Sequence, residues 1–172
     1  MTPLHEVIIN KKTTINPVWI MRQAGRYLPE FKEIRKKNPN FIELCLNHKL
    51  SSEITLQPIK RFDLDAAIIF SDILMLPYGL NQKVDFKKNF GPVLGNLDIG
   101  TMSKIDEIDF VEKIYPVYKA IKSVSLEMTS KNKNTIGFVG APWTLLVYMI
   151  NQQSPKKNVK KDFFEDDFLI NR

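Results

Sequence analysis

The amino-acid sequence predicts an α/β fold in which parallel strands alternate with helices. Three short, largely apolar runs, at 18–21, 65–70 and 135–140, fit strands that are buried on both faces. The long segments between them have the apolar spacing of helices, as parallel βα units require. No glycine-rich phosphate or dinucleotide loop follows any run, which favours a (β/α)8 barrel over a doubly wound open sheet. Such a barrel needs about 200–250 residues, so a chain of 172 residues would supply about half of one.

The first sixty residues predict helices on both sides of the first apolar run. A short helix is expected within residues 1–10. Pro29 favours the start of a second helix, because proline suits the first helical turn. Asn40 can cap a third helix. A helical pattern then covers residues 50–59, and Pro58 is expected to kink or restart it.

The second half of the chain predicts a hairpin and two further helices. Residues 77–100 contain most of the glycines and are typical of loops, with an extended piece at 84–86 that fits a hairpin or an arm. From residue 110 to residue 128 apolar side chains recur every three or four positions. This spacing predicts a long amphipathic helix, which Pro116 is expected to bend. Pro142 then favours a helix directly after the third apolar run.

Composition and charge exclude several classes of protein. The net charge is +6, but the lysines are scattered along the chain, so no nucleic-acid partner is expected. No apolar run approaches the 18–20 or so residues that span a bilayer, and no membrane association is expected. Cys45 is the single cysteine, which suits the reducing cytoplasm and a small buried residue better than a nucleophile. Cys45, His5 and His48 show no paired spacing, so no metal site is expected.

Polar side chains follow each of the three predicted strands. Arg22 and Arg26 come directly after the first run, and a guanidinium offers a planar fork that matches a carboxylate. Gly25 between them permits a tight turn or a close approach to a ligand. Asp72 ends the second run, where it can accept hydrogen bonds from a ligand, and Tyr148 follows the third. Each has an alternative: the arginines can pair with helix carboxylates, Asp72 can cap a helix, and Tyr148 can belong to the core.

Four blocks of this sequence closely resemble the uroporphyrinogen decarboxylase family. They are PVWIMRQAGRYLPEF at 17–31, LQP at 56–58, LDAAIIFSDIL at 64–74 and GFVGAPWTL at 137–145. The blocks lie in the expected order and extend over most of the chain. The resemblance therefore implies that residues 1–172 are the N-terminal portion of a single, truncated barrel domain of this family.

The resemblance also implies an activity and the residues that perform it. The family forms a (β/α)8 barrel, acts as a homodimer and removes carbon dioxide from the four acetate side chains of uroporphyrinogen, giving coproporphyrinogen in heme biosynthesis without metal or organic cofactor. By resemblance, Arg22 and Arg26 bind substrate carboxylates, and one of them relays a proton. Asp72 accepts hydrogen bonds from the pyrrole N–H groups and stabilises the protonated ring, and Tyr148 positions the acetate arm or a protonated intermediate. The substrate-binding residues implied in this way are Arg22, Gln23, Ala24, Gly25, Arg26, Phe31, Ile68, Phe70, Asp72 and Tyr148.

This sequence departs from the family in its length. Family members are roughly twice as long, and the later strands, with a serine and a histidine that line the pocket, have no counterpart here. Half a barrel leaves open edges, so we expect this chain alone to be unstable or aggregation-prone and to have negligible activity. A separately encoded C-terminal half would complete it. The alternatives are a cobamide-dependent methyltransferase of the same superfamily, which would use zinc, and a split-gene remnant without a function of its own.

Overall fold

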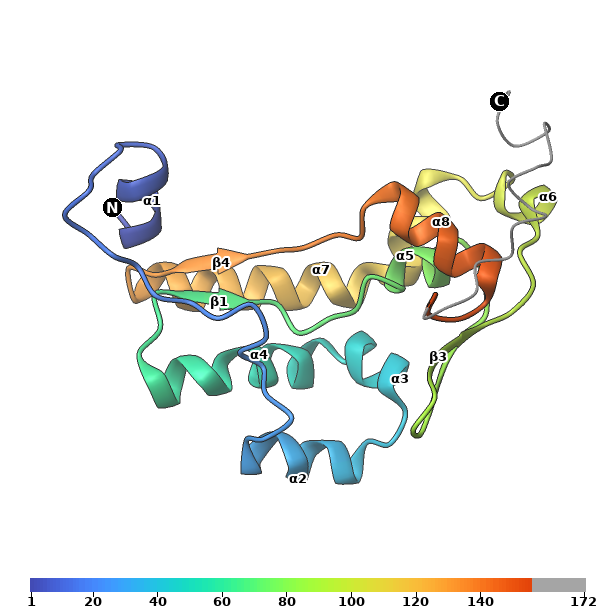
Figure 1. The fold of residues 1–172 in the computed structure, drawn as a ribbon, viewed down its shortest axis with the longest axis horizontal. Coiled ribbons are helices and arrows are strands. Elements are labelled where there is room, and N and C mark those ends of the chain that lie inside the picture. Colours follow the sequence, from blue (N-terminus) through green and yellow to red (C-terminus); the bar gives the residue numbers. More distant parts are fainter. Residues whose placement is uncertain (156–172) are drawn as a thin grey trace. The chain divides into compact units, whose positions relative to one another are not determined.

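The computed structural model describes residues 1–155, which form a mixed α/β fold (Figure 1). The predicted domain of residues 1–172 thus extends beyond the described residues. In chain order the elements are α1 (Pro3–Ile8), α2 (Pro29–Lys37), α3 (Phe41–Leu46), α4 (His48–Phe62), β1 (Ala66–Ile68), α5 (Met75–Gly79), β2 (Val84–Lys87), β3 (Gly91–Leu94), α6 (Ile99–Met102), α7 (Glu107–Ser130), β4 (Asn134–Ile136) and α8 (Pro142–Asn151). The chain divides into two compact units. Residues 1–72 and 114–138 form the first unit, and residues 73–113 and the chain from 139 onward form the second.

A parallel pair of strands lies at the centre of the first unit. β1 and β4 are hydrogen-bonded neighbours, with Ala67 opposite Thr135. The N–H of Ile69 donates to the carbonyl oxygen of Ile136 (3.1 Å) and so continues the ladder past β1. Parallel neighbours require a crossover connection, and the predicted parallel βα arrangement is confirmed for this pair. Both strands are only three residues long, shorter than the apolar runs that predicted them.

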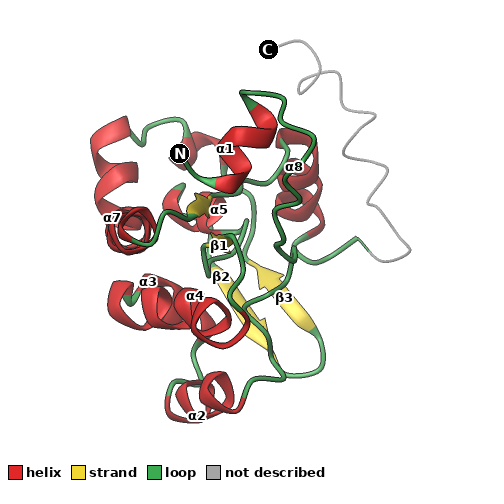
Figure 2. Ribbon diagram, turned by 90° about the vertical axis from the view of Figure 1, so that its left-hand side faces the viewer, coloured by secondary structure: helices red, strands yellow, loops and turns green. Residues whose placement is uncertain are grey.

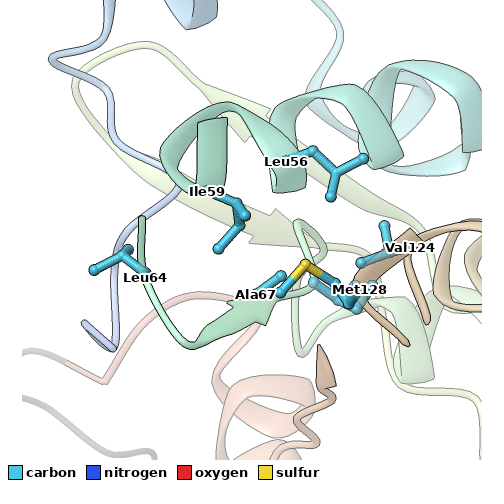
Figure 3. Close-up of a cluster of buried hydrophobic side chains, with 7 residues drawn as sticks. Leu56, Ile59, Leu64, Ala67, Val124 and Met128 are labelled. Atoms are coloured by element: carbon cyan, nitrogen blue, oxygen red, sulfur yellow. The ribbon is translucent and has the colours of Figure 1, made fainter. Parts of the chain in front are cut away.

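The core of the first unit joins two helices to β1. Leu56 and Ile59 of α4 meet Val124 and Met128 of α7 against the strand, as the labelled side chains in Figure 3 show. The full cluster consists of Leu56, Ile59, Leu64, Ala67, Ile69, Val124 and Met128. Burying a large aliphatic side chain contributes about 1.5–3 kcal/mol, so this cluster attaches both helices to β1. α4 also contacts α2 and therefore separates α2 from the sheet (Figures 1 and 2).

The predicted helix starts are confirmed. The side-chain oxygen of Asn40 accepts hydrogen bonds from the N–H groups of residues 42 (3.0 Å) and 43 (3.3 Å) at the start of α3. Pro29 and Pro142 begin α2 and α8, as expected for proline in a first helical turn. The expected restart at Pro58 is wrong, because α4 continues through this residue to Phe62. Pro58 is itself fully buried within this helix.

The first apolar run does not form the buried strand that the sequence predicted. Residues 18–21 are 41–75% exposed and belong to no strand. The segment lies extended beside β1: the N–H of Asp65 donates to the carbonyl oxygen of Val18 (2.9 Å), and the N–H of Val18 donates to the Asp65 carboxylate (2.7 Å). A continuous apolar run is buried only where something covers both of its faces. Within residues 1–155 these side chains remain uncovered, and so do Phe138 and Val139 in the third run (47% and 77% exposed).

The second unit contains the predicted hairpin. β2 and β3 pair antiparallel, with Val84 opposite Leu94, and Gly91 takes the positive φ (99°) that favours glycine next to the turn. α8 is bound to this hairpin region by hydrogen bonds. The N–H of Leu94 donates to the carbonyl oxygen of Gln152 (2.8 Å), and the buried Gln82 amide donates to Met149 (3.0 Å).

Candidate functional site

Two consecutive turns carry Arg22 and Arg26. The N–H of residue 23 donates to the carbonyl oxygen of residue 20 (3.1 Å) and closes the turn 20–23. The N–H of residue 28 donates to the carbonyl oxygen of residue 25 (3.0 Å) and closes the turn 25–28. Each arginine occupies a central position of its turn, and both side chains are exposed. The first unit therefore presents two guanidinium groups from one short segment of main chain.

Neither guanidinium is paired with a carboxylate within the described part of the chain. Glu30 is the acidic residue nearest to them in sequence, but both of its oxygens accept hydrogen bonds from Arg61 (3.0 and 2.9 Å). The Arg61 guanidinium lowers the pKa of Glu30. The alternative in which Arg22 and Arg26 pair with helix carboxylates is therefore not supported by residues 1–155. Both cations are available to an external anion.

Gln23 is the one member of the segment whose polar side chain is fully buried (2% exposed). Its Nε2 donates to the carbonyl oxygen of Ala66 at the start of β1 (2.7 Å), and its Oε1 accepts from the N–H of Ile20 (3.1 Å). The family resemblance implied that Gln23 is one of the substrate-binding residues. The structure shows its amide bound to main chain at both ends, which gives it a structural task that spacing alone did not reveal.

Gly25 has a steric rather than a conformational reason to be glycine. A Cβ atom at this position would lie 2.1 Å from Cε1 of the Tyr27 ring, so the ring rests directly on the main chain. Gly25 is buried and does not have a positive φ. A side chain at position 25 would therefore require the exposed Tyr27 ring to move. Ala24, beside it, is half-buried and equally small.

The chain leading into Asp72 is held by two hydroxyl groups of α4. Ser51 Oγ donates to the carbonyl oxygen of Phe70 (2.6 Å), and Thr55 Oγ1 accepts from the N–H of Phe70 (2.8 Å). These bonds fix the main chain two residues before Asp72, which is half-buried. The N-cap residue of α5 is Leu74, two residues after Asp72.

The negative charge of Asp72 affects the pKa of the Cys45 thiol on α3. Burial raises the pKa of Cys45 to about 12, the negative charge of Asp72 contributes to the increase, and Arg35 opposes it. Cys45 has no exposed surface, so its prediction as a small buried residue is confirmed. The same effect places the Asp72 carboxylate close enough to α3 to act on groups there.

Two of the predicted apolar residues of the pocket, Phe31 and Phe70, lie in an aromatic cluster. The ring of Phe70 makes edge contacts with Phe31 (5.9 Å between centroids) and Phe41 (5.7 Å). Phe31 and Phe70 are 6% and 8% exposed, so their surfaces are used mainly in packing. Ile68 of β1 is half-buried and more accessible. Phe41 was missed from the sequence, where the only signal was an aromatic residue directly after the Asn40 cap.

Tyr148 belongs to the second unit and is described within it. It lies on α8 and is half-buried, between the buried neighbours Val147 and Met149. Its hydroxyl oxygen is 3.3 Å from Oγ of Ser154, so the two groups share a hydrogen bond. The ring is therefore partly in the core, as one alternative expected, while its hydroxyl has a polar partner. Nothing in the sequence pattern identified Ser154.

Residues 1–155 contain neither a metal-binding cluster nor a membrane-spanning helix. No group of three or more His, Cys, Asp or Glu side chains comes together there in a way that would hold a metal ion. No helix in this part of the chain is both long enough and apolar enough to cross a bilayer.

Comparison with known proteins points to one family. The family model described as "Uroporphyrinogen decarboxylase (URO-D)" matches residues 1–172. A curated uroporphyrinogen decarboxylase of Agrobacterium fabrum is 46% identical over 144 residues, covering 83% of this chain and 42% of the relative. That of Rickettsia canadensis is 46% identical over 155 residues (89% and 45%), and that of Campylobacter jejuni is 42% identical over 171 residues (97% and 50%). The chain thus spans about half the length of the curated relatives it matches.

Proposed function

The chain belongs to the uroporphyrinogen decarboxylase family, and from this premise we propose that it supplies the arginines and the central carboxylate of a decarboxylase site. The proposed reaction removes the four acetate carboxyl groups of uroporphyrinogen as carbon dioxide and yields coproporphyrinogen in heme biosynthesis. The observation that carries the proposal is the pair of exposed arginines on consecutive turns, neither of which is paired with a carboxylate within residues 1–155.

The arginine pair suits the charge of the substrate. Uroporphyrinogen carries eight carboxylates around four pyrrole N–H groups, so its binding requires fixed cations at its rim. Hydrogen bonds to charged groups contribute about 1.5–3 kcal/mol each, and the guanidinium fork adds a defined direction. Arg22 and Arg26 lie four residues apart on two turns and can contact neighbouring carboxylates. One of them would also relay the proton that the reaction consumes.

Asp72 suits the centre of the substrate. A carboxylate can accept hydrogen bonds from several pyrrole N–H groups at once. Protonation of the pyrrole α-carbon next to the carbon that bears an acetate arm makes that ring cationic, and a nearby negative charge stabilises the cation. The bond to the carboxyl carbon then breaks, its electron pair enters the cationic ring, and carbon dioxide leaves. A second protonation converts the remaining exocyclic methylene into a methyl group, and loss of the first proton restores the pyrrole.

The remaining parts of the proposal concern the surroundings of this site. Tyr148 would position the acetate arm or the protonated intermediate, and Phe31, Ile68 and Phe70 would support an apolar wall. A (β/α)8 barrel, assembled as a homodimer or completed by a separately encoded C-terminal half, would enclose the site. The chemistry needs no metal or organic cofactor, because the protonated ring itself accepts the electron pair. The single buried cysteine suits the cytoplasm as the compartment.

The test is an anaerobic assay of coproporphyrinogen formation by the 172-residue chain combined with the C-terminal half of the Campylobacter jejuni relative. We expect activity from the combination and negligible activity from the chain alone. Asp72→Asn should lower kcat at least about 100-fold, as loss of a transition-state charge does. Asp109→Asn is the matched control, because Asp109 is an exposed aspartate on α7. Near-normal turnover by Asp72→Asn, or no turnover by the unsubstituted combination, would contradict the proposal.

A further inference from the structure

We propose that Gln23 is a positioning residue for the two arginines, because its side-chain amide replaces a rung of the hydrogen-bond ladder beside β1. Gln23 would act on the substrate only through the arginine turns, without touching the substrate with its own amide. The inference rests on the proposed function of Arg22 and Arg26, and it assigns a separate physical task to the residue next to Arg22.

The replaced rung follows from four hydrogen bonds. The segment starting at Val18 runs beside β1 and makes one main-chain bond there, from the N–H of Asp65 to the carbonyl oxygen of Val18 (2.9 Å). The N–H of Val18 donates to the Asp65 side-chain carboxylate (2.7 Å). In a continuing ladder, Ile20 would next bond directly to β1. Instead, the N–H of Ile20 donates to Oε1 of Gln23 (3.1 Å), and Nε2 of Gln23 donates to the carbonyl oxygen of Ala66 (2.7 Å). The amide connects the two main chains across one side-chain length.

This task requires an amide of one particular length. The amide is buried (2% exposed) and must accept at one end and donate at the other. Glutamate would keep the acceptor but direct a second oxygen at the Ala66 carbonyl. Methionine has a similar length and neither function, so Ile20 N–H and the Ala66 carbonyl would each lose a partner. Asparagine has the amide but is one methylene too short to connect both groups.

The Gln23 amide forms a bridge between Ile20 and Ala66, and this bridge limits the positions that the two arginines can take. Ile20 and Gln23 are bonded twice, once by main chain (3.1 Å) and once through the Gln23 side chain (3.1 Å), so the turn that carries Arg22 is closed twice. The chain then leaves this fixed point toward Arg26. Neither arginine side chain is held by a hydrogen bond within residues 1–155. Within residues 1–155, the side-chain hydrogen bonds from segment 20–28 to β1 are those of Gln23. Loss of Gln23 would therefore release the main chain that carries both arginines.

The experiment measures two quantities on the 172-residue chain combined with the C-terminal half of the Campylobacter jejuni relative, with and without the substitution Gln23→Met. The first is the hydrogen-exchange rate of the Ile20 amide, measured by NMR. The second is the Kd for uroporphyrin III, the air-stable octacarboxylate, at low ionic strength. We expect the Ile20 amide to be protected in the unsubstituted chain and to exchange at least about tenfold faster in the variant. We expect uroporphyrin binding to weaken by about tenfold. Gln23→Asn should behave as Gln23→Met does, which covers the case in which one variant fails to fold.

A double-mutant cycle separates positioning from general destabilisation. In an Arg22→Gln/Arg26→Gln background, Gln23→Met should change the Kd by less than about twofold, since a residue that acts through the arginines has nothing left to position. Gln57→Met is the matched control. Gln57 is a buried glutamine of α4 (6% exposed) whose amide has no hydrogen-bond partner among the described residues, and this variant should bind as the unsubstituted chain does.

The outcomes distinguish the inference from the proposed function. An Ile20 amide that exchanges freely in the unsubstituted chain overturns the bridge without any variant. An equal loss of affinity on Gln23→Met in both backgrounds overturns the positioning role, because it indicates destabilisation alone. If Arg22→Gln/Arg26→Gln binds uroporphyrin as tightly as the unsubstituted chain, the proposed arginine site fails, and with it the positioning role. The bridge itself is then still decided by the Ile20 amide.

Discussion

Cys45 makes the stability of the first unit depend on pH in the alkaline range. Its pKa rises from 9.0 to about 12, chiefly through burial, with the charge of Asp72 adding to the increase. The folded chain therefore holds the thiol proton more tightly than the unfolded chain does. This contribution to stability is fully present below the unfolded pKa and is lost as the pH rises toward the folded pKa.

The magnitude follows from the size of the shift. One pKa unit corresponds to about 1.4 kcal/mol, so a shift of this size is worth about 4 kcal/mol in full. By about pH 10.5 the unfolded thiol is largely ionised while the folded thiol is not. The free energy of unfolding should then be about 2 kcal/mol lower than at about pH 7.5 through Cys45 alone.

The assay is urea unfolding of the unsubstituted chain and of Cys45→Ala at both pH values, followed by far-UV circular dichroism. Other titrating groups contribute equally to both proteins, so the difference between their pH dependences isolates the thiol. Cys45→Ala should lose less stability on going to alkaline pH, by about 2 kcal/mol. Asp72→Asn in a chain that keeps Cys45 should make stability depend less steeply on pH, because it removes the second cause of the raised Cys45 pKa. Parallel pH dependences in the unsubstituted chain and Cys45→Ala would refute the reasoning.

Two further substitutions test the packing and capping that position the site. Phe70→Leu keeps a large apolar side chain but removes two edge contacts, with Phe31 and Phe41. Each such aromatic pair is worth about 0.5–1.5 kcal/mol. The substitution should therefore lower the free energy of unfolding by about 1–3 kcal/mol. A double-mutant cycle with Phe41→Leu should give a coupling energy within that range, and zero coupling would contradict the contact. Asn40→Ala removes the cap of α3 and should cost about 1 kcal/mol in urea unfolding. An unchanged urea midpoint would show that α3 does not need this cap.

The sequence predicted the helices of this fold better than its strands, because helix signals are local. Asn40, Pro29 and Pro142 mark helix starts by their own chemistry, and the long helix α7 repeats its apolar residues at a fixed spacing. A strand depends on partners that are distant in sequence. The run at 18–21 has the composition of a buried strand, yet within residues 1–155 it remains exposed beside β1.

The candidate site was also only partly predictable. The arginines could be identified by type and spacing, and the structure places both on exposed turns. Whether these residues and Asp72 act on a tetrapyrrole stays a prediction. The task of Gln23 was not predictable, because its partner Ala66 lies 43 positions further along the chain. The hydroxyl groups of Ser51 and Thr55 were missed for the same reason, since nothing in a helix sequence shows which strand its polar side chains will reach.

The two hydrogen bonds between α4 and the main chain of Phe70 have a consequence for self-association. A strand edge with free N–H and carbonyl groups invites another chain to add itself as a further strand. At Phe70 both groups are already bonded to the hydroxyls of Ser51 and Thr55 (2.6 and 2.8 Å), and Thr55 is itself bonded to the carbonyl oxygen of Ser51 (2.7 Å). A helix therefore blocks this position against strand addition. Fibrillar or edge-to-edge association should begin elsewhere in the first unit, where main-chain groups beside β1 have no such cover.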